Sequence, residues 1–384
     1  MQMYYVSRVA AAISLVVLTG AAWFSIRLAA ADIQFRAGSS ESVARAIAIQ
    51  PDNAEYLAFH ALQLEYDGAD STALLERAAA VSRMSSTPRI RLGLAAEIRG
   101  DFATAERWLL DAVGIDRQFE PRWTLANFYF RRENANAFWN WMRQALEVSY
   151  ADRSPAFDLC WRVGDAATIL ERAIPERREV SAAYVMYVLE SHRDAVAPAA
   201  MKLAGFSNPD DRAQLLAADD ALIDAQDVKP ARELWKAIGN SLPAGVTNGD
   251  FAATPLQHGF DWRWAEVPGV VRTKLEQGLR IALDGREPES CQLLSQIVSL
   301  EAHTRYRLRW ETRTSGLSNP VGMEWRIGDQ AGQIEASDAA STGEIRFNAP
   351  TELVPLTLTY HRPAGRARAE GSVEITRVSV ERVQ

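Results

Sequence analysis

The sequence predicts a multidomain chain with a helical part followed by a β part: an N-terminal transmembrane helix, a solenoid of paired α-helices and a C-terminal β-sandwich. Three observations predict it. The first 31 residues contain a long uncharged run, and small side chains return about every 33 residues between positions 40 and 150. Beyond residue 243, apolar residues alternate with polar ones. We therefore divide the chain into residues 1–31, 32–243 and 244–384.

The bulk composition sets the broad class of protein. With 384 residues, the chain is longer than one compact core usually organises. Hydrophobic residues make up 48% of the sequence, which excludes a largely disordered chain. The net charge is −7, and acidic and basic residues are mixed along the chain without a basic block. Because phosphate binding needs clustered Lys and Arg, we expect no nucleic-acid partner.

The N-terminal segment contains a run of 18 uncharged residues, 9–26, which Arg8 and Arg27 bracket. This length is close to the minimum for a helix that crosses a bilayer. Secretory signals normally have a shorter apolar core followed by small residues. Ala29 and Ala31 are small residues of that kind, so two alternatives stay open: an uncleaved membrane anchor, which we favour, and a cleaved signal peptide.

The flanking charges indicate the orientation only weakly. Arg8 and the amino terminus favour a cytoplasmic N-terminus, whereas Arg27 and Arg36 favour the reverse. We expect a single-pass protein of the cytoplasmic (inner) membrane, with the bulk of the chain periplasmic or extracytoplasmic.

The middle of the chain carries an internal repeat. Alanines that close an apolar helix face recur at spacings of 32, 34 and 33 residues, namely at Ala46, Ala78, Ala112 and Ala145. Three residues before each alanine stands a large apolar residue: Val43, Leu75, Leu109 and Met142. A pair of helices of this length cannot bury its apolar face alone, and small residues let neighbouring helices approach. We expect the turn within the clearest unit at Arg99-Gly100-Asp101, because Gly permits the backbone reversal.

This pattern resembles the tetratricopeptide repeat, most clearly from Ser86 to Gln118, with a weaker match from 150 to 245. The resemblance implies that the first helix of each unit lines a concave groove that holds a protein partner. Carried over by register, the groove residues of the aromatic segment 119–145 are Trp123, Asn127, Phe130 and Arg131. The competing interpretation of the aromatic residues in this segment is burial in the helix core.

Short alternating segments begin after the linker-like residues 241–250. In the clearest segment, 304–314, aromatic, Leu and Thr side chains fall on one face and mainly Arg on the other. The Arg face has a simple interpretation as a solvated sheet surface. Further predicted strands are 279–283, 293–300, 323–327, 345–347, 356–360 and 373–380. Seven or eight short strands in this length predict a β-sandwich.

The segment resembles the galactose-binding-like jelly rolls, which include many carbohydrate-binding modules. The resemblance rests on fold markers such as Asn248-Gly249-Asp250-Phe251 and Gly259-Phe260-Asp261-Trp262. Sugars stack on aromatic faces, so Trp262, Arg263 and Trp264 are the candidate carbohydrate-binding residues. Modules of this type often hold calcium; Asp250 and Asp284 are candidate ligands, but they do not complete an oxygen cage, and we expect no metal.

Catalytic motifs are absent from the sequence. It contains no Gly-x-Ser-x-Gly elbow, Walker loop or Rossmann fingerprint. Its five histidines are scattered, and the two cysteines, Cys160 and Cys291, fall in different predicted domains. We therefore expect no catalytic residue, no cofactor and no enzymatic activity.

The resulting functional hypothesis is a membrane-anchored, non-catalytic scaffold that holds protein partners. Similar membrane-tethered tetratricopeptide proteins of the bacterial envelope serve exopolysaccharide synthesis and export, so the resemblance implies such a role. The alternative is a glycan-binding protein in which the sandwich binds polysaccharide and the solenoid is a spacer.

Overall fold

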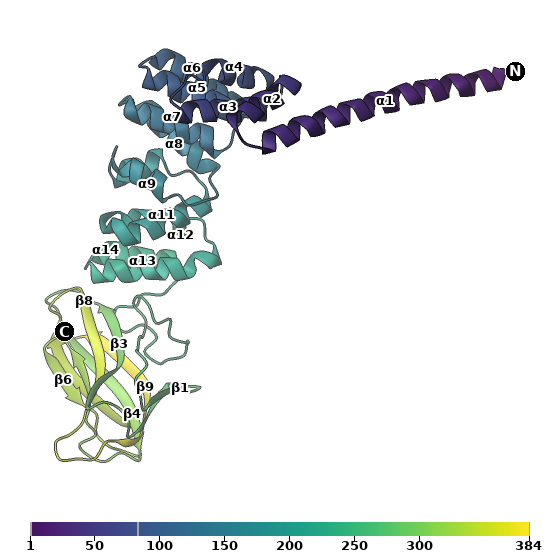
Figure 1. The fold of residues 1–384 in the computed structure, drawn as a ribbon. Coiled ribbons are helices and arrows are strands. Elements are labelled where there is room, and N and C mark those ends of the chain that lie inside the picture. The colour runs from purple at the N-terminus through teal and green to yellow at the C-terminus, as the bar shows by residue number, and fades with distance from the viewer. Residues whose placement is uncertain (1, 83, 384) are drawn as a thin grey trace. The chain divides into compact units, whose positions relative to one another are not determined.

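The computed structural model describes the backbone of residues 2–82 and 84–383, with side chains from Ile13 onward except at 83 (Figure 1). The chain divides into two compact units. One unit holds the chain up to Gly164 together with Glu171–Pro175, and the other holds Asp165–Leu170 and the chain from Glu176 onward. In the described residues, fourteen α-helices precede nine β-strands, which confirms the predicted order of a helical and a β part.

The helical elements occupy the chain up to residue 237. The α-helices are α1 (Gln2–Arg36), α2 (Ser40–Ile49), α3 (Ala54–Tyr66), α4 (Thr72–Val81), α5 (Thr87–Ile98), α6 (Phe102–Ile115), α7 (Phe119–Arg131), α8 (Ala135–Glu147), α9 (Ser154–Trp161), α10 (Ala166–Arg172), α11 (Arg178–Ser191), α12 (Val196–Ala204), α13 (Arg212–Asp224) and α14 (Val228–Ala237). Two short 3-10 helices, η1 (Arg193–Ala195) and η2 (Pro209–Asp211), lie among them.

Helix α1 continues from the apolar segment into the first helical hairpin without a break. Its described apolar side chains from Ile13 to Ile26 are exposed. The side chains of the first four residues of the predicted run, 9–12, lie outside the described side chains. Near its C-terminal end, Ala31 is fully buried, and the Phe35 ring stacks on Tyr56 of α3 with 4.5 Å between ring centroids.

The packing of the repeat follows the predicted spacing. All eight recurring residues are fully buried: Val43, Ala46, Leu75, Ala78, Leu109, Ala112, Met142 and Ala145. At Gly93 of α5, an added Cβ would lie 2.7 Å from the Leu109 side chain of α6, so the two helices approach closely there. Gly100 has φ +82° in the turn between α5 and α6, at the predicted position.

Side-chain caps define several helix starts. The Ser39, Asn53, Asp101 and Asn134 side chains accept hydrogen bonds from the first-turn N–H groups of α2, α3, α6 and α8. These residues satisfy backbone donors that a helix N-terminus leaves unpaired. The hairpins therefore begin where short polar residues precede the apolar pattern.

The β part contains two antiparallel sheets. Its strands are β1 (Val270–Lys274), β2 (Leu279–Asp284), β3 (Ser290–Ser299), β4 (Arg305–Ser315), β5 (Met323–Ile327), β6 (Gln330–Gln333), β7 (Ser341–Asn348), β8 (Leu353–His361) and β9 (Glu370–Arg382). Five strands pair in the order β1-β2-β9-β4-β7, and four pair in the order β3-β8-β5-β6. The strands β1 and β6 were not predicted, because neither shows clear alternation.

The sandwich core lies between the two sheets. Along β4, buried and less buried residues alternate as predicted, with Tyr306, Leu308 and Trp310 on the buried face. Successive side chains of a β-strand point to opposite faces of the sheet, so every second one reaches the core. The residues before β1 also enter the core: Phe251 and Trp262 are fully buried and stack with 5.1 Å between centroids.

Candidate functional site

The four predicted groove residues all belong to helix α7. Trp123, Asn127 and Phe130 are half-buried, and Arg131 is more exposed. The Trp123 ring stacks on Phe119 with 5.8 Å between centroids, and the Asn127 amide donates to the carbonyl oxygen of Trp123 at 2.9 Å. This bond uses one of the two Asn127 amide N–H donors. The role of these residues in binding stays a prediction.

Arg131 links α7 to α5. Its Nε and Nη2 donate to the two carboxylate oxygens of Glu97, each at 2.7 Å. These bonds to the Glu97 carboxylate raise the pKa of Arg131. Because two parallel bonds fix both side chains, Arg131 connects α7 to α5 of the neighbouring hairpin. Part of the Arg131 side chain still faces solvent.

Helices α3 and α5 carry apolar side chains that are exposed or, at Leu94, half-buried. Leu62 and Tyr66 on α3, and Leu94 and Ile98 on α5, form what we call the apolar row. Tyr66 is 93% exposed, Ile98 is 88% exposed and Leu62 is 53% exposed. Each α5 residue follows its α3 counterpart by 32 residues, so the two pairs hold the same positions in consecutive hairpins.

A cavity of about 530 Å³ adjoins this row. Leu94 and Ile98 line it from α5, and residues 68–72 of the turn between α3 and α4 line the opposite side. Arg91 and Glu65 also line it, and they form a salt bridge of 2.7 Å. The cavity therefore combines an apolar wall with a charged pair, an arrangement suited to a peptide with apolar side chains and polar flanks.

The predicted residue Phe130 lines a separate, smaller cavity of about 260 Å³. Tyr129 and Phe138 of the same hairpin contribute to it, as do Arg162 and Val163 after α9. Phe130 therefore borders a cavity that is separate from the one lined by Leu94 and Ile98.

Sequence reasoning missed the apolar row because it followed the aromatic density of segment 119–145. The signal was present: large apolar residues recur 32 residues apart, at 62 and 94 and again at 66 and 98. An apolar residue that repeats outside the packing positions has no neighbouring helix to cover it.

The predicted sugar platform on the sandwich is wrong for Trp262. Its side chain is fully buried, and its indole N–H donates to the carbonyl oxygen of Asn248 at 2.9 Å. Arg263 is also engaged within the protein, since its guanidinium bonds the carbonyl oxygen of Gly259 and the Asp220 carboxylate. Trp264 is half-exposed, and the Arg272 guanidinium lies 5.8 Å from its ring centre. Because the Trp262 ring is buried and Arg263 is bonded within the protein, the three residues do not form the expected platform.

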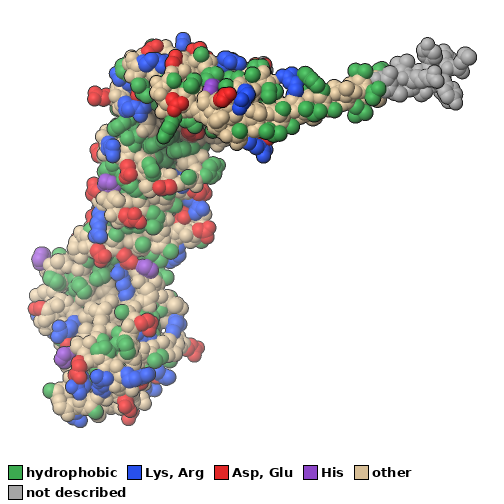
Figure 2. Space-filling model, in the orientation of Figure 1, with side chains coloured by type: hydrophobic (Ala, Val, Ile, Leu, Met, Phe, Trp, Pro, Cys, Tyr) green, Lys and Arg blue, Asp and Glu red, His purple; other side chains and the backbone are tan. Residues whose placement is uncertain are grey.

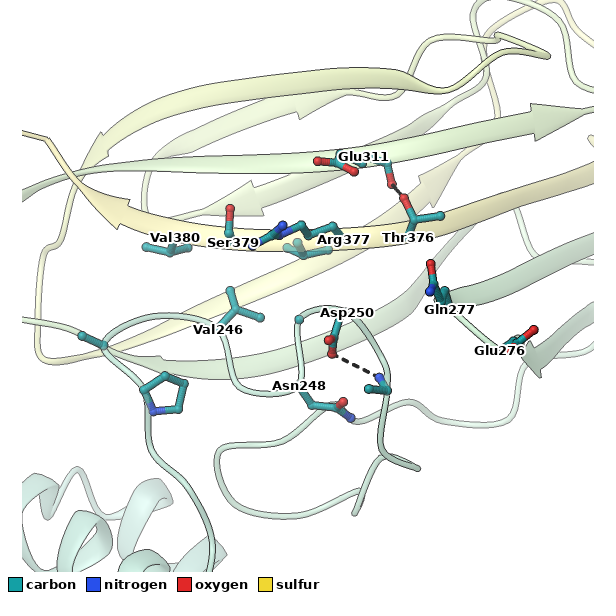
Figure 3. A pocket seen from close by; sticks show the side chains of 15 residues that line it. Val246, Asn248, Asp250, Glu276, Gln277, Glu311, Thr376, Arg377, Ser379 and Val380 are labelled. Carbon is teal, nitrogen blue, oxygen red and sulfur yellow. Dashed lines mark hydrogen bonds between the residues drawn. The ribbon is translucent and has the colours of Figure 1, made fainter.

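A cavity of about 870 Å³ on the sandwich lies over strand β9 (Figure 3). Glu311 of β4 and Arg377 of β9 line it, and Figure 3 shows the loop with Asn248 and Asp250 on the opposite side. None of its described lining residues is aromatic. The cavity can therefore offer hydrogen bonds and charges to a ligand, but it does not offer a stacking face.

The two candidate calcium ligands each have a partner within the protein. Asp250 accepts the Ala252 N–H at 3.1 Å, and Asp284 pairs with Arg286. Within the described residues, no group of three or more His, Cys, Asp or Glu side chains is arranged to hold a metal ion.

Helix α1 presents the second candidate interaction surface. Its segment Ile13–Arg36 is long and apolar enough to cross a membrane. Figure 2 shows apolar side chains along the described length of this helix. At the hairpin end, the Arg27 guanidinium lies 4.9 Å from the Trp23 ring centre and donates to the carbonyl oxygen of Ile49 at the end of α2.

No protein-family model matches the sequence, and no curated protein matches it either. Among solved structures, the helical part is similar to tetratricopeptide proteins. One is the C-terminal part of a TPR repeat-containing protein from Cytophaga hutchinsonii, at 12% identity and TM-score 0.29, covering 56% of this chain and 93% of that one. Another is YrrB, described as a TPR protein with an unusual peptide-binding site, at 12% identity and TM-score 0.27, covering 52% and 92%.

The β part is similar to carbohydrate-binding modules. A CBM4 structure matches at 13% identity and TM-score 0.29, covering 36% of this chain and 99% of that one. The module TmCBM61, solved with β-1,4-galactotriose, matches at 20% identity and TM-score 0.25, covering 36% and 95%. The likeness in each case concerns the fold.

Proposed function

We propose that the protein is a membrane-anchored scaffold that holds a protein partner against its helical hairpins. The observation that carries this proposal is the apolar row. Soluble surfaces scatter single apolar side chains, whereas grouped ones mark interaction sites. Tyr66 and Ile98, each nearly fully exposed, lie on consecutive hairpins, and Ile98 lines a cavity of about 530 Å³. The groove extends to Trp123, Asn127, Phe130 and Arg131 on α7 in this proposal.

The partner that fits the row is an extended or helical segment with apolar side chains and flanking charges. Leu94 and Ile98 would contact its apolar residues. Arg91 and Glu65, which form a salt bridge at the cavity wall, would meet its polar groups and fix its direction.

We propose further that α1 stays uncleaved and anchors the chain. Cleavage near Ala29 or Ala31 would cut the helix inside the first hairpin, where Ala31 is fully buried and Phe35 stacks on Tyr56. It would also remove Arg27, whose guanidinium bonds the end of α2. The cut would therefore open the helix next to a packed part of the hairpin core and remove the bond from Arg27 to α2.

The location and pathway are the finer part of the proposal. We place the helices and sandwich on the periplasmic side of the inner membrane, and we assign the scaffold to exopolysaccharide synthesis or export. One helix that is long and apolar enough to cross a membrane supports the membrane part of this proposal. We assign no catalytic role to the chain, and we keep the division at residues 31 and 243 as its functional organisation.

The test is partner capture by the full chain extracted in detergent. Wild type would be compared with Tyr66→Asp/Ile98→Asp, and with the matched control Leu110→Asp on α6, where Leu110 is 41% exposed. After cross-linking and mass spectrometry, we expect one set of proteins with wild type and the control, and its loss with the double variant. Equal capture by all three would refute the groove.

A glycan-binding role is the second candidate, and Trp264 is the residue that favours it. Of the nine Phe, Tyr and Trp side chains described from residue 246 onward, it is the one that is not buried. Polysaccharide binding that disappears in Trp264→Ala and survives Tyr66→Asp/Ile98→Asp would favour this role over the scaffold.

A further inference from the structure

The loop that precedes the sandwich is packed against the last helical hairpin through Gly259. A Cβ at this position, where φ is +57°, would lie 2.1 Å from the Trp235 ring of α14 and 2.6 Å from Asp219 Oδ2 of α13. The next residue, Phe260, meets the Trp235 ring edge-on with 5.7 Å between centroids. Both rings are buried. The loop 256–263 is thus docked on the helices, and it is not a free linker.

Asp220 of α13 ties this loop to the helix. One carboxylate oxygen lies 2.6 Å from His258 Nδ1. The other accepts the Gly259 N–H at 2.7 Å and pairs with Arg263 Nη2 at 2.7 Å. All three partners belong to the loop, so the Asp220 side chain alone binds three of the loop's polar groups.

Asp219, the preceding residue, lies beneath this cluster. Its side chain is fully buried, and neither carboxylate oxygen has a hydrogen-bond partner among the described residues. Burial, and then the charge of Asp220, raise the pKa of Asp219 to about 8, although Arg263 acts in the opposite direction. A buried, unpaired carboxylate is strongly unfavourable when ionised.

We propose that Asp219 is a proton-controlled latch between the last helical hairpin and the sandwich. The protonated carboxyl lets Gly259 and Phe260 stay docked on α13 and α14. When it ionises, Gly259 and Phe260 move away from α13 and α14 and the carboxylate reaches water, whereas Trp262 stays in the sandwich core. The charged groups that face Asp219 are Asp220 on the same helix and Arg263 on the loop, with His258 beyond Asp220. The ring of Trp235 faces it from α14.

A second contact holds the sandwich when the latch opens. Arg232 of α14 donates to Ser299 Oγ at 2.7 Å and to the carbonyl oxygen of Leu300 at 3.0 Å, and it pairs with Glu352 at 3.2 Å. These bonds do not involve Asp219. Opening is therefore confined to the loop, and the sandwich remains attached through Arg232.

The direction of the pH effect follows from proton linkage. The docked state binds the Asp219 proton more tightly than the released state, in which an exposed carboxyl has a pKa of about 4. Docking is therefore strongest in acid and weakens as pH rises from about 4 toward 8, after which it levels off. The residues of the latch all lie in the unit that contains the chain from Glu176 onward, and the latch does not depend on the proposed scaffold role.

The test is hydrogen exchange of the full chain in detergent between pH 5 and 9, with rates corrected for the intrinsic pH dependence. In wild type, protection of the Gly259 amide, which donates to Asp220, should fall by up to about tenfold per pH unit as far as pH 8 and then level off. In Asp219→Asn, which cannot ionise, protection should be constant with pH. Asp219→Val gives the same readout should the Asn variant misfold.

Three control variants test whether the pH dependence of protection comes from Asp219. Glu287→Gln removes another fully buried carboxyl, in the turn between β2 and β3, and should leave the pH response intact. Gly259→Ala should expose the loop at every pH, because its Cβ collides with Trp235. A response that persists in Asp219→Asn but vanishes in His258→Gln would overturn the latch, as would constant protection in wild type.

Discussion

The helical hairpins leave Tyr66 and Ile98 almost fully exposed, whereas the sandwich buries eight of its nine described aromatic side chains. The open face of β4 carries charges instead: Arg307 pairs with Glu381 at 3.1 Å, and Arg309 lies 3.9 Å from Glu344. A face of paired charges is well solvated, and such surface pairs contribute little to stability or binding. The two regions therefore differ in the side chains that they expose: apolar ones stand out on α3 and α5, and paired charges cover the open face of β4.

Replacing Trp262 by Ala should have the largest effect on stability. The ring is fully buried and stacks on Phe251, so we expect the free energy of unfolding of the sandwich to fall by about 3–5 kcal/mol. Denaturant titration followed by near-UV circular dichroism measures it. Trp264→Ala, at a half-exposed ring, should cost clearly less. Equal losses would show that Trp264 is as deeply packed as Trp262.

A methyl group at Gly93 should destabilise the hairpin of α5 and α6. The added Cβ would lie 2.7 Å from Leu109 and 3.2 Å from the carbonyl oxygen of Ala105, so we expect a loss of about 1–3 kcal/mol in the free energy of unfolding. Gly114→Ala on α6 is the matched control, because no atom lies within 4 Å of its new Cβ. There the higher helix propensity of Ala should stabilise by up to about 1 kcal/mol. Thermal or denaturant unfolding compares the two, and the same sign for both would contradict close packing at Gly93.

Breaking the Arg131–Glu97 pair should have a smaller effect. A double-mutant cycle with Arg131→Ala and Glu97→Ala should give a coupling energy of about 1 kcal/mol, since the Arg131 side chain is 44% exposed and water screens the pair. The coupling should shrink as salt is added. A coupling that stays constant in high salt would indicate a pair sheltered from solvent.

Tyr66→Asp should change stability least. A side chain that is 93% exposed loses no packing on substitution, so we expect less than about 0.5 kcal/mol in the free energy of unfolding. Partner capture should nevertheless be lost in combination with Ile98→Asp. A fall of several kcal/mol in unfolding experiments would mean that Tyr66 belongs to the core and not to a contact surface.

Much of the fold could be predicted from local pattern. The spacing of the recurring alanines predicted residues that are fully buried, and alternation at 304–314 predicted strand β4. The short strands β1 and β6 escaped prediction, because an edge strand shows little alternation in burial: β6 is exposed at three of its four residues. The groove was predicted on the aromatic helix α7, while the apolar row lies on α3 and α5.

The sequence by itself determined the periods: small residues every 33 or so positions require stacked helical pairs, and a period of two requires a sheet. Only the tertiary structure decided which aromatic faces meet solvent and what surrounds Asp219. Trp262 and Trp264 are two residues apart and alike in sequence, yet the first is fully buried and the second is half-exposed. Asp219 is buried by Gly259, forty residues away along the chain. Burial depends on segments that the chain brings together from a distance, and no local pattern records that distance.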